Sequence, residues 1–205
     1  MNSIVLKTNA VIIFTKNPQL GKVKTRLAAT MGDIQALDIY RELLSITNKI
    51  VSSLDDSIER LVFYSDSIAY EDLWSENRFV KKLQYGNDLG QRMEQAFQIA
   101  LEHHDHVIII GSDCPYITKN IIETCFFRLE DNDVVIGPTN DGGYYLLGMN
   151  NLHKNLFRGI EWSTEFVFKQ TKSILAEHGL KYWQAPMLSD IDFEQDWLTY
   201  LQKKE

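Results

Sequence analysis

The sequence has few residues that would divide it into separate parts. Its four prolines and eleven glycines are spread along the chain, and no stretch rich in them marks a linker or a low-complexity segment. Hydrophobic residues make up 44% of the chain, which is enough for a packed core and argues against disorder. We therefore expect residues 1–205 to form a single folded domain.

Long apolar runs and a disulfide framework are also lacking. The longest apolar runs, such as residues 107–110, are far too short to cross a bilayer, and the first residues carry no signal-peptide core or cleavage site. The chain has two cysteines, Cys114 and Cys125, and two thiols do not make a disulfide framework. These absences predict a cytoplasmic protein without a membrane span.

A surplus of positive charge is absent as well. The chain carries 28 acidic and 21 basic residues, which gives a formal net charge of -7. A protein that wraps nucleic acid needs a basic surface, because it must neutralise phosphates, so we expect no nucleic-acid partner. A small phosphorylated ligand, in contrast, needs only a local group of cations.

Such a group occurs in the segment FTKNPQLGKVKTRLA, residues 14–28, directly behind the first apolar run. Its four cations are Lys16, Lys22, Lys24 and Arg26. An arginine can hold two phosphate oxygens at once, whereas lysines act as point charges. Gly21 is the only glycine in the segment, which is therefore neither a P-loop nor a dinucleotide fingerprint. A solvated loop is the alternative, but the concentration of cations in an acidic chain favours a phosphate site.

Short apolar stretches alternate with helical patterns along the chain. Strands are expected at residues 10–14, 60–64, 78–85, 106–111, 133–138, 143–149 and 180–186. Helices are expected at residues 33–54, 88–103, 118–129, 164–178 and 193–202. This alternation predicts an α/β fold with a mostly parallel sheet. One strand, at residues 144–149, follows its predecessor too closely for a crossover helix, so we expect a mixed sheet.

Polar loops follow several of these strands. In open α/β sheets, ligands bind outside the carboxyl ends of the strands. The loops in question are residues 15–26, 112–115, 139–143 and 189–192. They could therefore converge in one cleft.

Two of these loops contain carboxylates suited to a metal ion. Asp113 lies just past a buried strand in IIIGSDCP, and Mg²⁺ is usually bound by one or two carboxylates together with phosphates and water. Asp190 and Asp192 alternate in LSDIDFEQDW and share a face in extended backbone, so one of them could complete the site. The alternatives are structural, with Asp113 in a turn or helix cap and Asp192 capping the last helix. If Thr118 caps the helix after Asp113, that carboxylate is free for other work.

Two further segments are candidates for contact with a substrate. In GPTNDGGYYLLG, Gly142 and Gly143 allow a ligand to approach the backbone closely, and Asp141 would face it. An ordinary hairpin turn is the alternative, and both interpretations can hold together. In EWSTEF, Ser163 and Thr164 stand at an expected helix start, where capping is the main interpretation and contact with a substrate oxygen the second.

Together these motifs resemble the nucleotide-diphospho-sugar transferase superfamily, which has a GT-A-like fold. The resemblance is carried by FTKNPQLGKVKTRLA, NDLGQRM, GSDCP, NDGGYYLLG, WST and DIDFEQDW, which span nearly the whole chain. The chain looks most like the DUF2064 group of bacterial proteins, often labelled glycosyltransferases, and is similar to the molybdenum-cofactor and phospholactate guanylyltransferases. The resemblance implies a single-domain, Rossmann-like three-layer sandwich with a mostly parallel, mixed sheet.

The resemblance also implies roles for particular residues. The first loop would bind nucleotide phosphates through Lys16, Gly21, Lys22, Lys24 and Arg26. Mg²⁺ or Mn²⁺ would be held by Asp113 and Asp192, with Asp190 as a further candidate. The base or the sugar would lie near Gln84, Gly86, Leu89, Gly90 and Arg92. The chain departs from the related nucleotidyltransferases in lacking their glycine-rich first loop and the Thr-Pro pair of their carboxyl-terminal motif.

The expected function is that of a Mg²⁺-dependent transferase acting on a nucleoside triphosphate or a nucleotide-sugar together with a small acceptor. Nucleotidyl transfer is favoured, because a pyrophosphate leaving group requires more positive charge. The catalytic candidates are Asp113, Lys24, Arg26 and Asp141, and no side-chain nucleophile is required. The alternatives are a glycosyltransferase with an NDP-sugar donor and a non-catalytic nucleotide-binding module. The sequence gives no indication of the oligomeric state.

Overall fold

One sheet runs through the part of the chain that the computed structural model describes, residues 8–204. Its seven strands within these residues are β1 (Asn9–Thr15), β2 (Ile58–Tyr64), β3 (Val80–Leu83), β4 (His106–Ile110), β5 (Val134–Pro138), β6 (Tyr144–Met149) and β7 (Tyr182–Gln184). They are arranged in the order β3-β2-β1-β4-β6-β5-β7. Only β6 runs antiparallel to its neighbours among these described strands, so the predicted mostly parallel, mixed sheet is confirmed.

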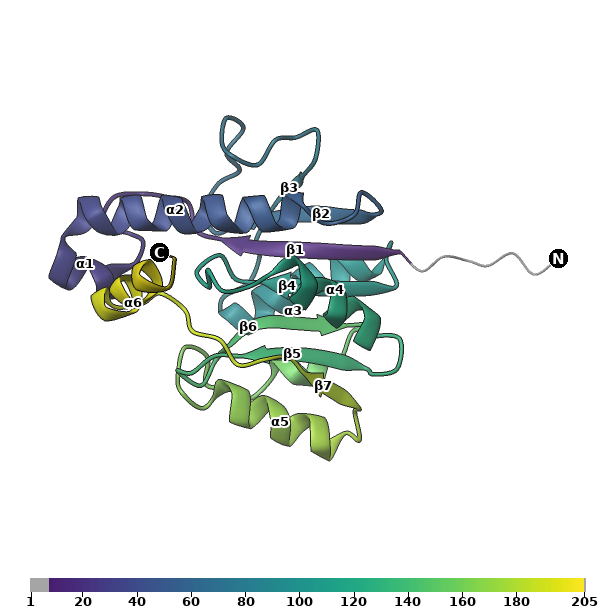
Figure 1. Ribbon diagram of the computed structural model, residues 1–205. Coiled ribbons are helices and arrows are strands. Elements are labelled where there is room, and N and C mark those ends of the chain that lie inside the picture. The colour runs from purple at the N-terminus through teal and green to yellow at the C-terminus, as the bar shows by residue number, and fades with distance from the viewer. Residues whose placement is uncertain (1–7, 205) are drawn as a thin grey trace.

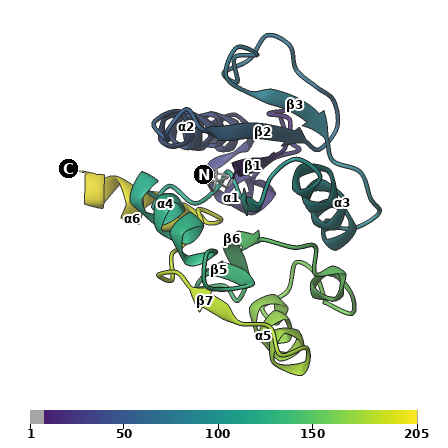
Figure 2. The same cartoon turned by 90° about the vertical axis from the view of Figure 1, so that its right-hand side faces the viewer.

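Helices cover both faces of this sheet (Figures 1 and 2). They are α1 (Thr25–Met31), α2 (Asp33–Ser52), α3 (Leu89–Leu101), α4 (Lys119–Arg128), α5 (Val167–Glu177) and α6 (Glu194–Lys204), with a short 3₁₀ helix, η1 (Lys154–Phe157). Helices α2 and α4 pack on one face, and α3, η1 and α5 pack on the other. The predicted three-layer α/β sandwich is therefore confirmed.

The central strands are apolar on both sides because both of their faces are covered. In β1, Val11 and Ile13 point into the core shared with α2 and α4. The alternate residues Ala10 and Ile12 point into the core shared with α3. Successive side chains of a strand face opposite sides of a sheet, so a continuous apolar run fills both cores at once.

Helices α1 and α6 lie beyond the carboxyl end of β1, where the arrow of that strand points in Figure 1. They share a third apolar cluster with α2, in which Leu27 of α1 and Leu43 of α2 are buried together with Ile191 and Trp197. Burying these side chains removes apolar area from water and holds the end of the chain against α1. Residues 189–192 are thereby brought next to the loop after β1.

The predicted elements are all present, with ends that differ by a few residues. The strand expected at residues 180–186 is limited to Tyr182–Gln184, and the one expected at residues 78–85 to Val80–Leu83. The helix expected from residue 164 begins at Val167, because Ser163 has a left-handed backbone with φ of 64°. The 3₁₀ helix η1 was not predicted, since four residues are too few to show a helical period.

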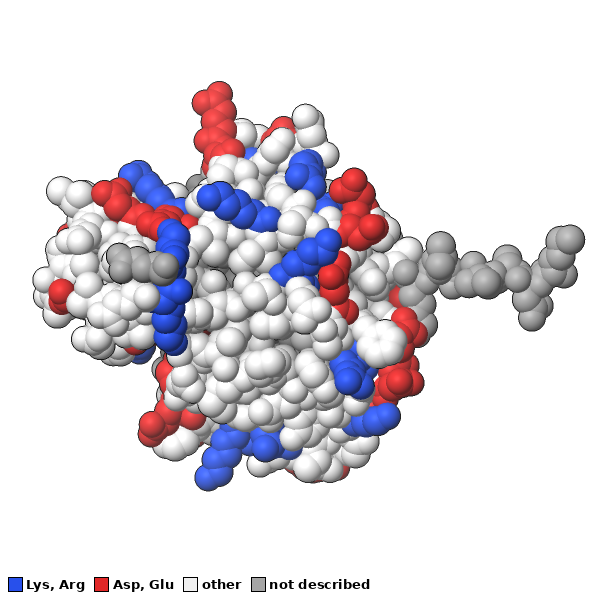
Figure 3. Space-filling view, in the orientation of Figure 1, with Lys and Arg blue, Asp and Glu red and all other residues white. Residues whose placement is uncertain are grey.

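The surface agrees with the charge pattern of the sequence. Figure 3 shows lysine and arginine interspersed with aspartate and glutamate, and the described residues form no broad basic area on the face in view. No helix among residues 8–204 is long and apolar enough to span a membrane.

Candidate functional site

Lys24 stands at the centre of a charged cluster at the carboxyl end of β1. Its Nζ lies 3.0 Å from Asp113 Oδ2 and 3.1 Å from Asp192 Oδ1. Arg26 Nη1 lies 2.9 Å from the other oxygen, Asp192 Oδ2. The structure thus brings together two carboxylates that lie far apart in the chain, along with two of the cations of the basic loop.

The members of this cluster differ in how exposed their side chains are. The side chain of Lys24 is only 6% exposed, whereas those of Asp113 and Asp192 are 42% and 30% exposed. Burial lowers the pKa of Lys24, but the charges of Asp113 and Asp192 outweigh this effect, and the pKa is raised overall. Burial also raises the pKa of Asp113, but Lys24 and, more weakly, Lys16 hold it below its usual value. Lys24 and Asp113 are therefore both ionised at neutral pH.

Neither carboxylate of the cluster serves as a helix cap. The hydroxyl of Thr118 accepts from the amide of Ile121 and caps α4, as the sequence suggested, which leaves Asp113 free of that role. At the start of α6, the carboxylate of Asp196 accepts from the amides of residues 192 and 193. The carboxylate of Asp192 is directed to Lys24 and Arg26 instead.

Asp190 has a different environment from the other two predicted metal ligands. Its Oδ1 is buried and has no hydrogen-bond partner. Burial, together with the charge of Asp113, raises its pKa to about 8, so the neutral form is favoured at pH 7. Among the described residues, no three His, Cys, Asp or Glu side chains are grouped so that they could hold a metal ion. The structure therefore does not place Asp190 in a three-carboxylate metal site with Asp113 and Asp192.

The basic loop is fastened at its start by a tyrosine that the helical pattern gave no reason to single out. The hydroxyl of Tyr40, in α2, accepts from the amide of Lys16 and donates to the carbonyl oxygen of the same residue. It also lies 3.3 Å from Ser112 Oγ, in the loop that carries Asp113. The buried side chain of Asn17 adds hydrogen bonds to the backbone of residues 66 and 67.

The remaining cations of this loop are exposed. Lys16, Lys22 and Arg26 face solvent, while Val23 anchors the loop in the core. Gly21 has φ of 72°, a conformation that favours glycine. The loop thus presents three accessible cations around the buried Lys24.

The NDGG turn lies beside the segment that contains Asp192. Asn140 donates its amide to the carbonyl oxygen of Leu188 and its side chain to Ser189 Oγ. Asp141 accepts from Thr139 Oγ1 and from the amide of Gly143, which is the hairpin-turn role. Contact between Asp141 and a substrate, the second interpretation, is compatible with this role in the turn.

The residues that follow Ser163 and Thr164 pack against the same turn. A Cβ added to Gly142 would lie 2.1 Å from the carbonyl oxygen of Glu165, so only glycine lets the two backbones approach. The amide of Phe168 donates to the carbonyl oxygen of Gly142 at 2.8 Å. Thr164 Oγ1 donates to the carbonyl oxygen of Glu161, a local turn bond rather than a helix cap. The two predicted substrate segments are thus adjacent.

The predicted base or sugar segment is attached to the ends of β1 and β2. Gln84 Nε2 donates to the carbonyl oxygens of Thr15 and Phe63, and Arg92 Nε donates to that of Gly86. Leu89 is 41% exposed. Gly90 is covered by Trp162, whose Nε1 would lie 2.4 Å from an added Cβ. Trp162 therefore joins the first turn of α3 to the segment of Ser163, a contact that the sequence did not predict.

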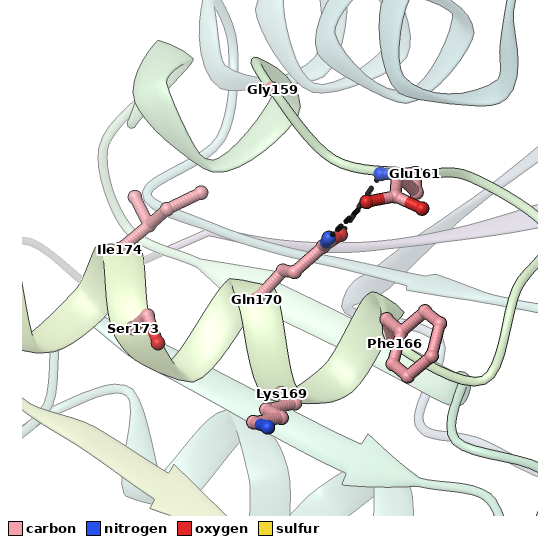
Figure 4. A pocket seen from close by; sticks show the side chains of 7 residues that line it. All are labelled: Gly159, Glu161, Phe166, Lys169, Gln170, Ser173 and Ile174. Atoms are coloured by element: carbon pink, nitrogen blue, oxygen red, sulfur yellow. Dashed lines mark hydrogen bonds between the residues drawn. The ribbon is translucent and has the colours of Figure 1, made fainter.

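A hollow of about 490 Å³ lies beside α5 (Figure 4). Its lining residues are Gly159, Glu161, Phe166, Lys169, Gln170, Ser173 and Ile174. Glu161 and Gln170 close one side through two hydrogen bonds, drawn as dashed lines in the figure. The lining contains none of the predicted site residues, so the candidate chemistry stays with the cluster around Lys24.

Comparisons with known proteins give this geometry a family context. A family described as "uncharacterized protein conserved in bacteria (DUF2064)" matches residues 51–164. The 2-phospho-L-lactate guanylyltransferase of Methanothermobacter thermautotrophicus is 28% identical over 67% of this chain and 60% of its own length. The enzyme of the same name from Methanocaldococcus sp. FS406-22 is 30% identical over 67% of this chain and 57% of its own length. The match thus spans less than two-thirds of these curated relatives.

Solved structures agree on the fold. A proposed nucleotide-diphospho-sugar transferase from Desulfovibrio desulfuricans G20 superposes with a TM-score of 0.84 and 29% identity, over 92% of this chain and 84% of its own. A 4-diphosphocytidyl-2C-methyl-D-erythritol synthase from Anaerococcus prevotii superposes with a TM-score of 0.64 over 96% of both chains; its 13% identity shows the fold alone. The chain therefore belongs to the DUF2064 family, within the nucleotide-diphospho-sugar transferase superfamily.

Proposed function

We propose that this chain is a Mg²⁺-dependent nucleotidyltransferase that joins a nucleoside triphosphate to a small anionic acceptor. The observation that carries the proposal is the cluster in which Asp113 and Asp192 meet at one cation, within a loop that presents further cations to solvent. The names of the curated relatives, both guanylyltransferases, support nucleotidyl transfer.

The donor set of the cluster is suited to Mg²⁺. Asp113 and Asp192 each direct an oxygen at the same ammonium group, so a single small cation can contact both carboxylates. Both carboxylates are partly exposed, which leaves room for phosphate oxygens and water as the other ligands. When bound there, Mg²⁺ would offset the charge that develops on the phosphates.

The residues of the loop would bind and orient the triphosphate. Lys16, Lys22 and Arg26 face solvent in the loop whose Lys24 meets the carboxylates, and there they would contact the β- and γ-phosphates. The acceptor oxygen attacks the α-phosphorus and forms a new P–O bond, while the bond from that phosphorus to the bridging oxygen breaks. The nucleoside monophosphate group is thus transferred to the acceptor, and the β- and γ-phosphates leave as pyrophosphate. The adjacent NDGG turn and Ser163 segment would hold the acceptor opposite the leaving group. Positioning and positive charge supply the rate enhancement, without a side-chain nucleophile.

A glycosyltransferase with an NDP-sugar donor is the second candidate. It is favoured by one observation, the 29% identity to a proposed nucleotide-diphospho-sugar transferase. The two candidates use the same cations and carboxylates and differ in the bond that breaks. Ligand preference therefore separates them.

A thermal-shift series with nucleoside triphosphates and NDP-sugars, with and without Mg²⁺, tests the proposal. Ligand at about 100 times its Kd adds about 2.7 kcal/mol of stability, or about 5–10 °C in Tm for a chain of this size. We expect a Mg²⁺-dependent shift with triphosphates and a smaller one with NDP-sugars. The reverse preference would support glycosyl transfer.

Pyrophosphate release then tests turnover, with GTP and 2-phospho-L-lactate as the first pair because the relatives carry those names. We expect Asp113→Asn to abolish release. The control is Asp38→Asn, which removes one exposed charge from a different part of the molecule, helix α2. Nucleotide binding and melting that are indifferent to Asp113→Asn would instead indicate a non-catalytic module or a different site.

A further inference from the structure

The ammonium group of Lys24 lies where the proposed function requires a divalent cation. It is held between Asp113 Oδ2 and Asp192 Oδ1 at 3.0 and 3.1 Å. The geometry points to a dual role, which rests on the proposed function: Lys24 is an internal counter-ion that occupies the metal position until nucleotide phosphates draw it away. Metal and nucleotide would then bind cooperatively.

Two cations cannot share this position. Mg²⁺ binds carboxylate oxygens at about 2.0–2.1 Å, so an ion between Asp113 and Asp192 would stand in direct contact with the ammonium group. Like charges so close repel strongly in a partly buried site. The ammonium of Lys24 must therefore move before a divalent cation can use both oxygens.

The backbone at Lys24 is held in an unusual conformation. With φ of 47° and ψ of 46°, it is left-handed, and among the described non-glycine residues only Ser163 shares a positive φ. Lys24 makes no side-chain cap bond to α1, and the two ion pairs are the contacts that fix its side chain. A left-handed lysine is strained, so this conformation persists because surrounding contacts hold it. Within residues 8–204, the hydrogen bonds of the ammonium group go to these two carboxylates.

Nucleotide phosphates offer the ammonium a new partner close by. Lys24 is in the same loop as Lys16, Lys22 and Arg26, the cations assigned to the triphosphate, so its Nζ can turn from the carboxylates to a phosphate oxygen. Arg26 keeps its contact with Asp192 Oδ2 and partly neutralises that carboxylate meanwhile. Triphosphate binding would vacate the metal position, and each ligand would raise the affinity for the other.

Mn²⁺ binding measured by calorimetry on the full chain, in the absence of nucleotide, tests this role. If the closed pair occupies 90–99% of molecules, it reduces the apparent Mn²⁺ affinity by about ten- to 100-fold. We expect Lys24→Met to bind Mn²⁺ at least about tenfold more tightly than the wild type, and to lose most of the increase that a triphosphate causes in the wild type. Lys22→Met is the matched control for the measurement without nucleotide, because it removes one exposed charge from the same loop, whereas the carboxylates pair with Lys24 and Arg26.

Equal Mn²⁺ affinities for wild type, Lys24→Met and Lys22→Met would overturn the counter-ion role. Equal gains in the two variants would do so too, because they would reflect general charge alone. Adding Asp113→Asn to Lys24→Met should abolish the tight site. If Mn²⁺ binding is independent of Asp113 in every variant, with or without triphosphate, the proposed function itself fails. Circular dichroism checks folding, and Lys24→Gln, which keeps hydrogen bonding without the charge, replaces Lys24→Met if that variant unfolds.

Discussion

The hydroxyl of Tyr40 joins the start of the basic loop to the loop of Asp113. It accepts from the amide of Lys16 at 2.9 Å, donates to the carbonyl oxygen of Lys16 at 3.1 Å, and lies 3.3 Å from Ser112 Oγ. Tyr40→Phe keeps the ring in the core but removes these contacts. At about 0.5–1.5 kcal/mol for each of the two backbone hydrogen bonds, the free energy of unfolding should fall by about 1–3 kcal/mol.

Urea unfolding measures this loss, and a lower midpoint with an unchanged slope is the expected result. For a loss of about 2 kcal/mol, Tm should fall by about 4–8 °C. Because the loop that carries Lys22 and Lys24 is then less firmly held, triphosphate affinity should also weaken.

The matched control is Tyr182→Phe, because the hydroxyl of Tyr182 makes no hydrogen bond to the described residues. Its free energy of unfolding should change by less than about 0.5 kcal/mol. If Tyr40→Phe unfolds at the same urea concentration as the wild type and binds triphosphate equally well, Tyr40 does not hold the loop in place.

Three further variants test other parts of the structure. Gly142→Ala should lower the free energy of unfolding, measured by urea unfolding, by about 2–4 kcal/mol, because the added Cβ would meet the Glu165 carbonyl oxygen and the backbone φ is 89°. The control is Gly159→Ala, which has a φ of 68° and open space around it and should lose only about 1 kcal/mol. Arg60→Met should lower the free energy of unfolding by about 3–5 kcal/mol, because this buried guanidinium group donates to carbonyl oxygens at the end of α2 and in the turn after it. A loss under about 1 kcal/mol would refute that role. Burial lowers the pKa of His153, so the unfolded chain is protonated there at a higher pH than the folded chain, and the free energy of unfolding should fall as pH drops through 6.5. In urea unfolding, His153→Gln should flatten this part of the pH profile, and an unchanged profile would contradict this role of His153.

Local patterns were sufficient to predict the strands and the helices of ten or more residues. The run at residues 107–110 is buried on both faces, so its uniform apolar character identifies a central strand without any knowledge of its neighbours. The order of the strands depends on contacts between distant segments. The insertion of β6 between β4 and β5 follows from pairings that no local pattern specifies, although the short connection did predict an antiparallel strand.

For the candidate site, the sequence likewise predicted which loops meet but not which side chains contact one another. The rule that ligands bind at the carboxyl ends of strands led to the loops of Lys24, Asp113 and Asp192, which the structure brings into contact. The ion pairs themselves were not predicted, because Lys24 was assigned to phosphate rather than to carboxylates 89 and 168 positions away. Tyr40 lies in the helix expected at residues 33–54, and periodicity says nothing about where a hydroxyl group points.

The packing of α6 on α1 has a consequence for how the protein is made. Every strand of the described sheet precedes Asp192 in the chain, so the sheet can assemble on the ribosome before that aspartate has emerged. Hydrogen bonds with residues 138, 140 and 113 hold residues 188–191, and the docking of Trp197 beside Leu27 then completes the packing that keeps the aspartate near Lys24. A nascent chain stalled after β7 would carry a finished scaffold but only half of the ion-binding pair, and it would start to bind its cation only when synthesis resumed.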